Sequence, residues 1–124
     1  MILGKFTVAI FLMTAPVWAQ FSREDMTKLA ADRCDTAVKS LKLSPDQASA
    51  IKPLLESKYI GIGQIKDVYR SSDKSNATKK DAKASLKTID GKYNAQINAI
   101  FTPEQAKAWK HMQKDWKDDL VLPK

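Results

Sequence analysis

The sequence contains only one cysteine and one histidine, and this scarcity excludes several kinds of site. No C-x-x-C-H run is present to attach a c-type haem. His111 and Asp115 are four residues apart and could share an ion, but two ligands do not make a metal site. No second imidazole and no G-x-S-x-G segment is available to activate a nucleophile. We therefore expect no enzymatic activity, no metal site and no cofactor.

The lone cysteine, Cys34, leaves three roles open. It falls on the apolar face of the first predicted helix, where a cysteine can pack as a small hydrophobic residue. In an oxidising compartment it could instead form a disulfide between two copies of the chain. A catalytic role is the weakest of the three, because the only imidazole lies far away in the sequence.

Large apolar side chains are also few. From Phe21 to Leu122 the chain has 27 Ile, Leu, Val, Met, Phe, Tyr and Trp residues. Small domains that are short of core often bury more apolar surface by associating with a second copy. We therefore expect a homodimer.

The longest hydrophobic run opens the chain, in the stretch MILGKFTVAIFLMTAPVWAQ. Lys5 precedes an apolar run over residues 6–13, and the residues before position 20 suit signal peptidase. The run is short of the about 20 residues that a membrane span needs. We expect residues 1–19 to be a signal peptide cleaved after Ala19, and residues 20–124 to be one periplasmic domain. That domain has 20 basic and 14 acidic residues, a net charge of +6.

A period of 3.6 residues recurs throughout the rest of the chain and predicts an all-α fold of four helices. The expected helices cover residues 22–42, 44–70, 77–100 and the chain from 102 onward, with a linker at 71–76. Pro53 lies inside the second helix and predicts a bend or a short break there. A bent, elongated arrangement follows.

Two of these helices begin with similar stretches, LSPDQ at 43–47 and FTPEQ at 101–105. In each, a hydroxyl residue can cap the helix and proline suits the first helical position. The acidic residue faces the positive end of the helix dipole, and the glutamine can close a capping box. Such starts occur in many unrelated helical proteins, so neither indicates a function alone. The motif residues are Leu43, Ser44, Gln47, Phe101, Thr102 and Gln105.

The combination of an export signal, a small basic helical domain and two such starts resembles the periplasmic LTxxQ family. This family includes Spy-like chaperones and CpxP-like adaptors of the envelope stress response. In motif, the chain departs from the family where Ser44 replaces threonine and Phe101 replaces leucine. The resemblance implies a bent four-helix hairpin that dimerises into a shallow cradle. It also implies an ATP-independent chaperone that binds unfolding proteins on its concave face, with structural roles for the motif residues.

Lysines form two stripes at helical spacing, many of them one residue after an apolar position. A surface that mixes cations with apolar patches suits weak, promiscuous binding, although a solvated helix face gives the same pattern. We expect unfolded or misfolded envelope proteins as partners. The stripes are Lys79, Lys83, Lys87 and Lys107, Lys110, Lys114, Lys117; the expected client-binding residues are Lys58, Ile62, Lys66, Tyr69 and Arg70, beside the predicted bend, with Lys83 and Lys87.

Several alternatives stay open beside this holdase hypothesis. A CpxP-like adaptor would bind the periplasmic domain of a sensor kinase and inhibit it. A metal-binding periplasmic sensor and a purely structural envelope protein are the other possibilities. Nucleic acid is disfavoured as a partner because the chain has an export signal and no recognised binding motif. Stable membrane insertion is disfavoured because the apolar stripes are needed for the core.

Overall fold

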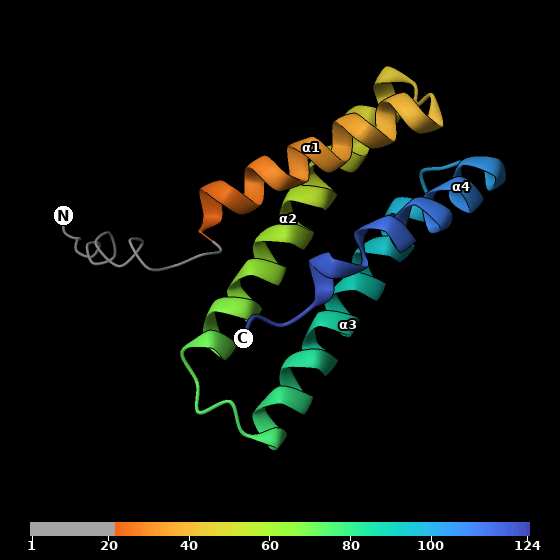
Figure 1. Ribbon diagram of the computed structural model, residues 1–124. Coiled ribbons are helices and arrows are strands. Elements are labelled where there is room, and N and C mark those ends of the chain that lie inside the picture. Colours follow the sequence, from red (N-terminus) through yellow and green to blue (C-terminus); the bar gives the residue numbers. More distant parts are fainter. Residues whose placement is uncertain (1–21) are drawn as a thin grey trace.

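The computed structural model describes residues 22–124, and this part of the chain is all-helical with no strand. The predicted fold class of four helices is therefore confirmed. The expected signal peptide, residues 1–19, lies outside the described residues. Four α-helices are followed by a short 3₁₀-helix: α1 (Arg23–Leu41), α2 (Pro45–Arg70), α3 (Asn76–Asn98), α4 (Pro103–Gln113) and η2 (Lys114–Leu120) (Figure 1).

Both predicted capping boxes are present. The hydroxyls of Ser44 and Thr102 accept hydrogen bonds from the backbone N–H groups of Gln47 and Gln105, at 3.1 and 3.2 Å. The glutamine side chains accept in return from the cap N–H groups, at 3.0 Å each. These reciprocal bonds satisfy backbone donors that a helix start otherwise leaves without partners.

The start of α3 is capped by Ser75, inside the stretch predicted to be a linker. Its hydroxyl accepts a hydrogen bond from the N–H of Thr78. Asp73 in turn accepts hydrogen bonds from the Ser75 N–H and the Thr78 hydroxyl, and these bonds lower the pKa of its carboxyl. The linker thus contributes its own helix cap.

Pro53 does not break α2. The helix runs without interruption from Pro45 to Arg70, through Pro53 and Gly61. A proline inside a helix removes one backbone hydrogen bond, but tertiary packing can hold the helix together around it. Ile51 and Leu55, on either side of the exposed Pro53, are both buried. The predicted break is therefore wrong.

Helix α2 is the central element, because it packs against both α1 and α3. The α1–α2 and α3–α4 turns lie at the same end of the molecule, and the α2–α3 linker lies at the other (Figure 1). Near the middle of α2, Ile89 of α3 comes so close to Gly61 that a side chain there would displace it. Glycine at this position leaves room for the end of the Ile89 side chain.

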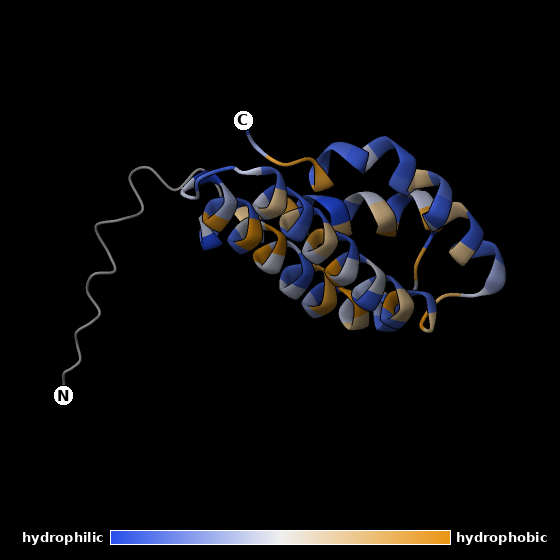
Figure 2. Ribbon diagram, turned by 90° about the horizontal axis from the view of Figure 1, so that it is seen from below, coloured by the Kyte–Doolittle hydropathy of each residue, from blue (hydrophilic) through white to orange (hydrophobic). Residues whose placement is uncertain are grey.

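The hydrophobic core lies between the facing sides of the helices, whose outward sides are hydrophilic (Figure 2). Trp109 of α4 is fully buried and meets the rings of Phe101 and Trp116 edge to face, with centroids 5.7 and 5.5 Å away. Cys34 is buried in this core, so the described structure places it as a packing residue. No helix among residues 22–124 has the length and apolar character of a membrane span.

The end of the chain differs from the expected continuous fourth helix. Helix α4 stops at Gln113, and the backbone of Trp116 leaves the helical region with φ −108° and ψ 16°. Lys114 and Lys117 therefore do not continue the stripe of Lys107 and Lys110 on one α-helix. Side-chain contacts of Trp116 and Asp119 with Arg33 of α1, and of Asp119 with Tyr59 of α2, hold this last segment in place.

Candidate functional site

The glutamines of the two motifs bind each other, although they are 58 positions apart. The side-chain N–H₂ group of Gln47 donates to Oε1 of Gln105 at 2.7 Å, and that of Gln105 donates to Oε1 of Gln47 at 3.3 Å. Gln47 also donates to the carbonyl of Ile100 at 3.2 Å, and Gln105 to that of Leu41 at 3.4 Å. Gln47 thus joins the start of α2 to the segment after α3, and Gln105 joins the start of α4 to the end of α1. Sequence reasoning predicted the caps but not this pairing.

A second polar cluster centres on Asp119 of η2. Its carboxylate accepts two hydrogen bonds from Arg33 of α1, at 2.9 and 3.0 Å, and one from the Tyr59 hydroxyl of α2, at 2.6 Å. The guanidinium of Arg33 also lies over the Trp116 ring, 4.8 Å from its centroid. Burial and then the bond to Asp119 raise the pKa of Tyr59 above its ordinary value. This cluster joins the end of the chain to α1 and α2.

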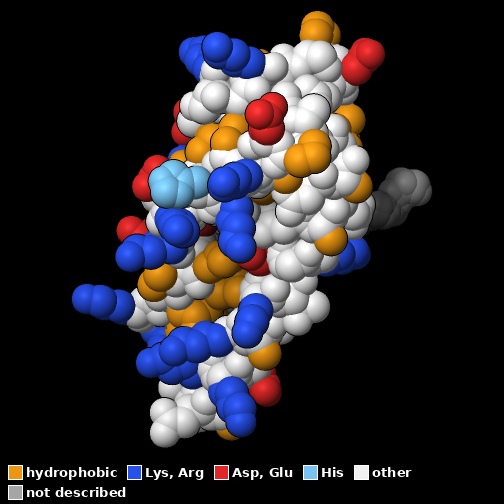
Figure 3. Space-filling model, turned by 90° about the vertical axis from the view of Figure 1, so that its right-hand side faces the viewer, with side chains coloured by type: hydrophobic (Ala, Val, Ile, Leu, Met, Phe, Trp, Pro, Cys, Tyr) orange, Lys and Arg blue, Asp and Glu red, His pale blue; other side chains and the backbone are white. Residues whose placement is uncertain are grey.

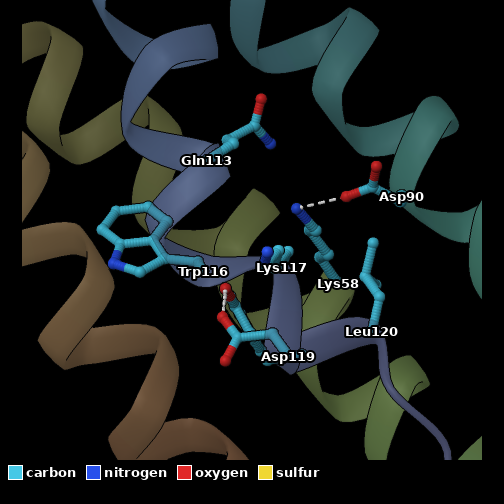
Figure 4. Close-up of a pocket in the computed structure, with 8 residues that line it drawn as sticks. Lys58, Asp90, Gln113, Trp116, Lys117, Asp119 and Leu120 are labelled. Atoms are coloured by element: carbon cyan, nitrogen blue, oxygen red, sulfur yellow. Dashed lines mark hydrogen bonds and ion pairs between the residues drawn. The ribbon is translucent and has the colours of Figure 1, made fainter.

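A third cluster lies beside the second, around the buried ammonium of Lys58. Lys58 pairs with Asp90 of α3 at 2.8 Å (Figure 4). It also donates a hydrogen bond to Oδ1 of Asn94 at 3.3 Å. The same Oδ1 accepts a hydrogen bond from Gln113 at 2.9 Å. A cavity of about 150 Å³ adjoins this network. Its lining residues are Lys58, Tyr59, Asp90, Gln113, Trp116, Lys117, Asp119 and Leu120.

An apolar groove of about 310 Å³ lies between α2 and α3, near the linker end. Ile65, Val68 and Tyr69 of α2 and Ala82 of α3 contribute its apolar lining. Val68 is 72 % exposed, the most exposed large hydrophobic residue in the described part of the chain. Seen from the side of α3 and α4, hydrophobic side chains reach the surface between many Lys and Arg side chains (Figure 3). We call the cavity lined by these residues of α2 and α3 the α2–α3 groove.

Four of the seven expected client-binding residues are inside the molecule. Lys58, Ile62, Lys66 and Tyr69 are 4, 1, 7 and 6 % exposed. The ammonium of Lys58 is paired with Asp90. Burial lowers the pKa of Lys66, while the negative charges of Asp119 and Asp118 act in the opposite direction. In this structure the side chains of Lys58, Ile62 and Lys66 are covered by other parts of the chain, and Tyr69 contributes only a small exposed area to the α2–α3 groove. Their role in client binding stays a prediction.

The other three expected client-binding residues stay accessible. Lys83 and Lys87 are exposed on α3, and Arg70 is half-buried at the end of α2. The spacing of α2 showed which residues share a face. It did not show that α3 and the end of the chain would cover that face.

Sequence reasoning missed the role of Asp119. One signal was available, because Trp116, Leu120 and Leu122 supply apolar residues up to the end of the chain. All three are packed against the core. An acidic residue between packed apolar residues is a candidate for a buried ion pair, but its partner Arg33 lies 86 positions away and could not be identified from the sequence.

Replacing Tyr59 by phenylalanine is expected to lower the free energy of unfolding by about 1–2 kcal/mol at neutral pH, because a hydrogen bond to a carboxylate is lost. The raised pKa adds a pH dependence. Above the ordinary tyrosine pKa of about 10, the unfolded chain loses the phenol proton while the folded chain keeps it. Stability from Tyr59 is therefore present below that pH and falls as the pH rises further.

Chemical denaturation between pH 7 and 11 would measure both effects. The Tyr59→Phe variant should show a shallower decline than the wild type above pH 10. Tyr93→Phe is the matched control, since Tyr93 is half-buried on α3 and its hydroxyl makes no hydrogen bond in the described structure. Equal stability and equal pH slopes for wild type and Tyr59→Phe would contradict the role of this bond.

Comparisons with known proteins found no match: no family model, no curated protein and no solved structure is similar to the chain. Within residues 22–124, no group of three or more His, Cys, Asp or Glu side chains is placed to hold a metal ion. The site therefore has to be interpreted from its own residues.

Proposed function

We propose that this protein is an exported, ATP-independent holdase, which binds unfolding envelope proteins through a mixed apolar and basic surface. The observation that carries the proposal is the α2–α3 groove. It combines an apolar lining with an accessible large hydrophobic residue, Val68. Exposed apolar surface on a soluble protein is often a binding site.

Charge around the groove supports the same function. The exposed lysines Lys79, Lys83 and Lys87 follow one another along α3, beside the groove residue Ala82. Cations at the rim accelerate encounters with acidic partners, while apolar contact holds them. Asp81 also lines the groove, so the surface around it carries a net positive charge but includes one acidic side chain.

The thin core supports weak and adaptable binding. Twelve apolar residues are only partly buried against the core, among them Leu54, Ile60, Ile65 and Ile89. A second copy could cover part of this surface, so dimerisation into a cradle belongs to the proposal. The paired glutamines would keep the helix starts of each copy in place.

Light scattering of two unrelated proteins during unfolding, without nucleotide, tests the holdase activity. The purified protein should suppress aggregation, and a basic helical protein of similar size and charge should not. One saturable partner recovered from a periplasmic extract, without any suppression, would instead support the adaptor of a stress sensor.

A matched pair of variants tests whether the groove is the binding surface. Val68→Ser should weaken client binding by up to about tenfold, the effect of losing about 1.4 kcal/mol of apolar contact. Ala84→Ser is the control, because Ala84 is exposed on α3 and does not line the groove. Equal losses in the two variants, or none in either, would count against the groove.

A further inference from the structure

The end of the described chain is held in place by a few side chains. The 3₁₀-helix η2 covers seven residues, but a kink at Trp116 divides it, so each part is a short 3₁₀ turn with poor hydrogen-bond geometry. None of its residues is fully buried. A segment with such weak backbone structure and little burial belongs to the least stable part of a fold. We call residues 114–124 the strap.

Trp116 and Asp119 anchor the strap, together with Leu120 and Leu122, which pack against the core. Asp119 receives the three hydrogen bonds from Arg33 and Tyr59, and Trp116 lies beneath the guanidinium of Arg33 and against the edge of Trp109. In Figure 4, Asp119 and Trp116 extend from the same short helix, and Asp119 bonds to a residue of α2. In the sequence, the aromatic residue Trp116 stands three positions before Asp119.

The surface under the strap belongs to other elements of the chain. Arg33 comes from α1, and Tyr59 and Lys66 come from α2. Arg33 and Tyr59 direct hydrogen-bond donors at the strap carboxylate, while Lys58 has its own partner, Asp90, on α3. Buried donors require acceptors, so any segment that takes the place of the strap has to supply a carboxylate. An aromatic ring beside it would restore the contact with Arg33.

We propose that the strap occupies, within its own chain, a peptide-binding site for client segments that carry an aromatic residue three positions before an aspartate, and that such a client displaces it. The inference rests on the proposed function, since it names the client segment that this protein would hold. It also explains why Lys58 and Lys66, expected at the client surface, are covered in this structure. Strap residues lie beside both lysines: Asp119 and Leu120 line the same cavity as Lys58, and the charges of Asp118 and Asp119 act on Lys66.

A labelled synthetic peptide of residues 114–124 tests the site by fluorescence anisotropy. We expect it to bind Asp119→Ala about tenfold more tightly than the wild type, because the variant weakens an intramolecular competitor of high effective concentration. Asp115→Ala is the matched control, since Asp115 is an exposed carboxylate of the same strap. A peptide with alanine at the position of Asp119 should not bind. Equal affinity of all three proteins for the peptide would overturn the proposal.

Hydrogen exchange of the unaltered protein gives a test that needs no variant. The amides of η2 should exchange through a local opening, with a free energy well below that of the amides in the middle of α2. Exchange of both sets only by global unfolding would show that the strap does not open, and would overturn the proposal even if Asp119→Ala fails to fold.

The same proteins separate this inference from the proposed function. Tight peptide binding by Asp119→Ala without any suppression of aggregation would support the peptide site and contradict the holdase function. Suppression of aggregation that depends on Val68, without peptide binding by Asp119→Ala, would support the holdase function and contradict the peptide site.

Discussion

Replacing Trp109 by alanine is expected to lower the free energy of unfolding by about 3–5 kcal/mol, the usual cost of deleting a buried aromatic side chain. Trp109 is fully buried and contacts both Phe101, at the start of α4, and Trp116, at the start of the strap. Its removal leaves a cavity between two elements that the ring joins. Because natural domains are stable by about 5–15 kcal/mol, this loss removes a large share of the total stability.

Chemical denaturation followed by circular dichroism would measure this loss. Trp109→Phe should cost less than the alanine variant, because a phenyl ring fills part of the volume and the indole N–H of Trp109 makes no hydrogen bond within the described chain. Val121→Ala, at an exposed site, is the control and should change stability by less than about 0.5 kcal/mol. A loss in Trp109→Ala no larger than in Val121→Ala would contradict the central position of this ring.

Replacing either Gln47 or Gln105 by alanine is expected to cost about 2–3 kcal/mol, because each side chain makes several hydrogen bonds worth about 1 kcal/mol apiece. Each substitution removes the bond to the neighbouring cap, the bond to the opposite turn and the contact with the other glutamine. The effect is therefore larger than the about 1 kcal/mol expected for loss of a single helix cap.

A double-mutant cycle would show whether the two motifs act together. The double variant should lose less than the sum of the single variants, with a coupling of about 1–2 kcal/mol, because the first substitution already breaks the shared bonds. Gln96→Ala is the control, since Gln96 is an exposed glutamine of α3. Strict additivity would mean that the glutamines serve only as local caps and that their pairing contributes nothing.

These predictions draw on two kinds of knowledge. The helix starts could be predicted because a cap is a local feature: Ser44, Gln47, Thr102 and Gln105 lie within three residues of the groups that they satisfy. The same locality explains the failure at Pro53. Proline chemistry predicts a weakened helix, but the packing of Ile51 and Leu55 against distant residues determines whether the helix breaks.

The candidate site was predicted only in part for the same reason. The burial of Trp109 agrees with the helical spacing of apolar residues along α4, since the apolar face is a property of one helix. Four of the residues expected to bind clients, Lys58, Ile62, Lys66 and Tyr69, are buried in this structure, because exposure depends on which other elements lie above a residue. A buried lysine and an exposed lysine look the same in a helical repeat.

The helical class and the helix starts could be predicted from the sequence, because they follow from a 3.6-residue period and local backbone chemistry. The basic charge follows from composition alone. The packing of distant elements was needed to show that Gln47 meets Gln105, that Arg33 and Tyr59 bind Asp119, and that the strap covers part of α2. The named hydrogen bonds join residues 58 to 86 positions apart, and their geometry depends on how whole helices pack.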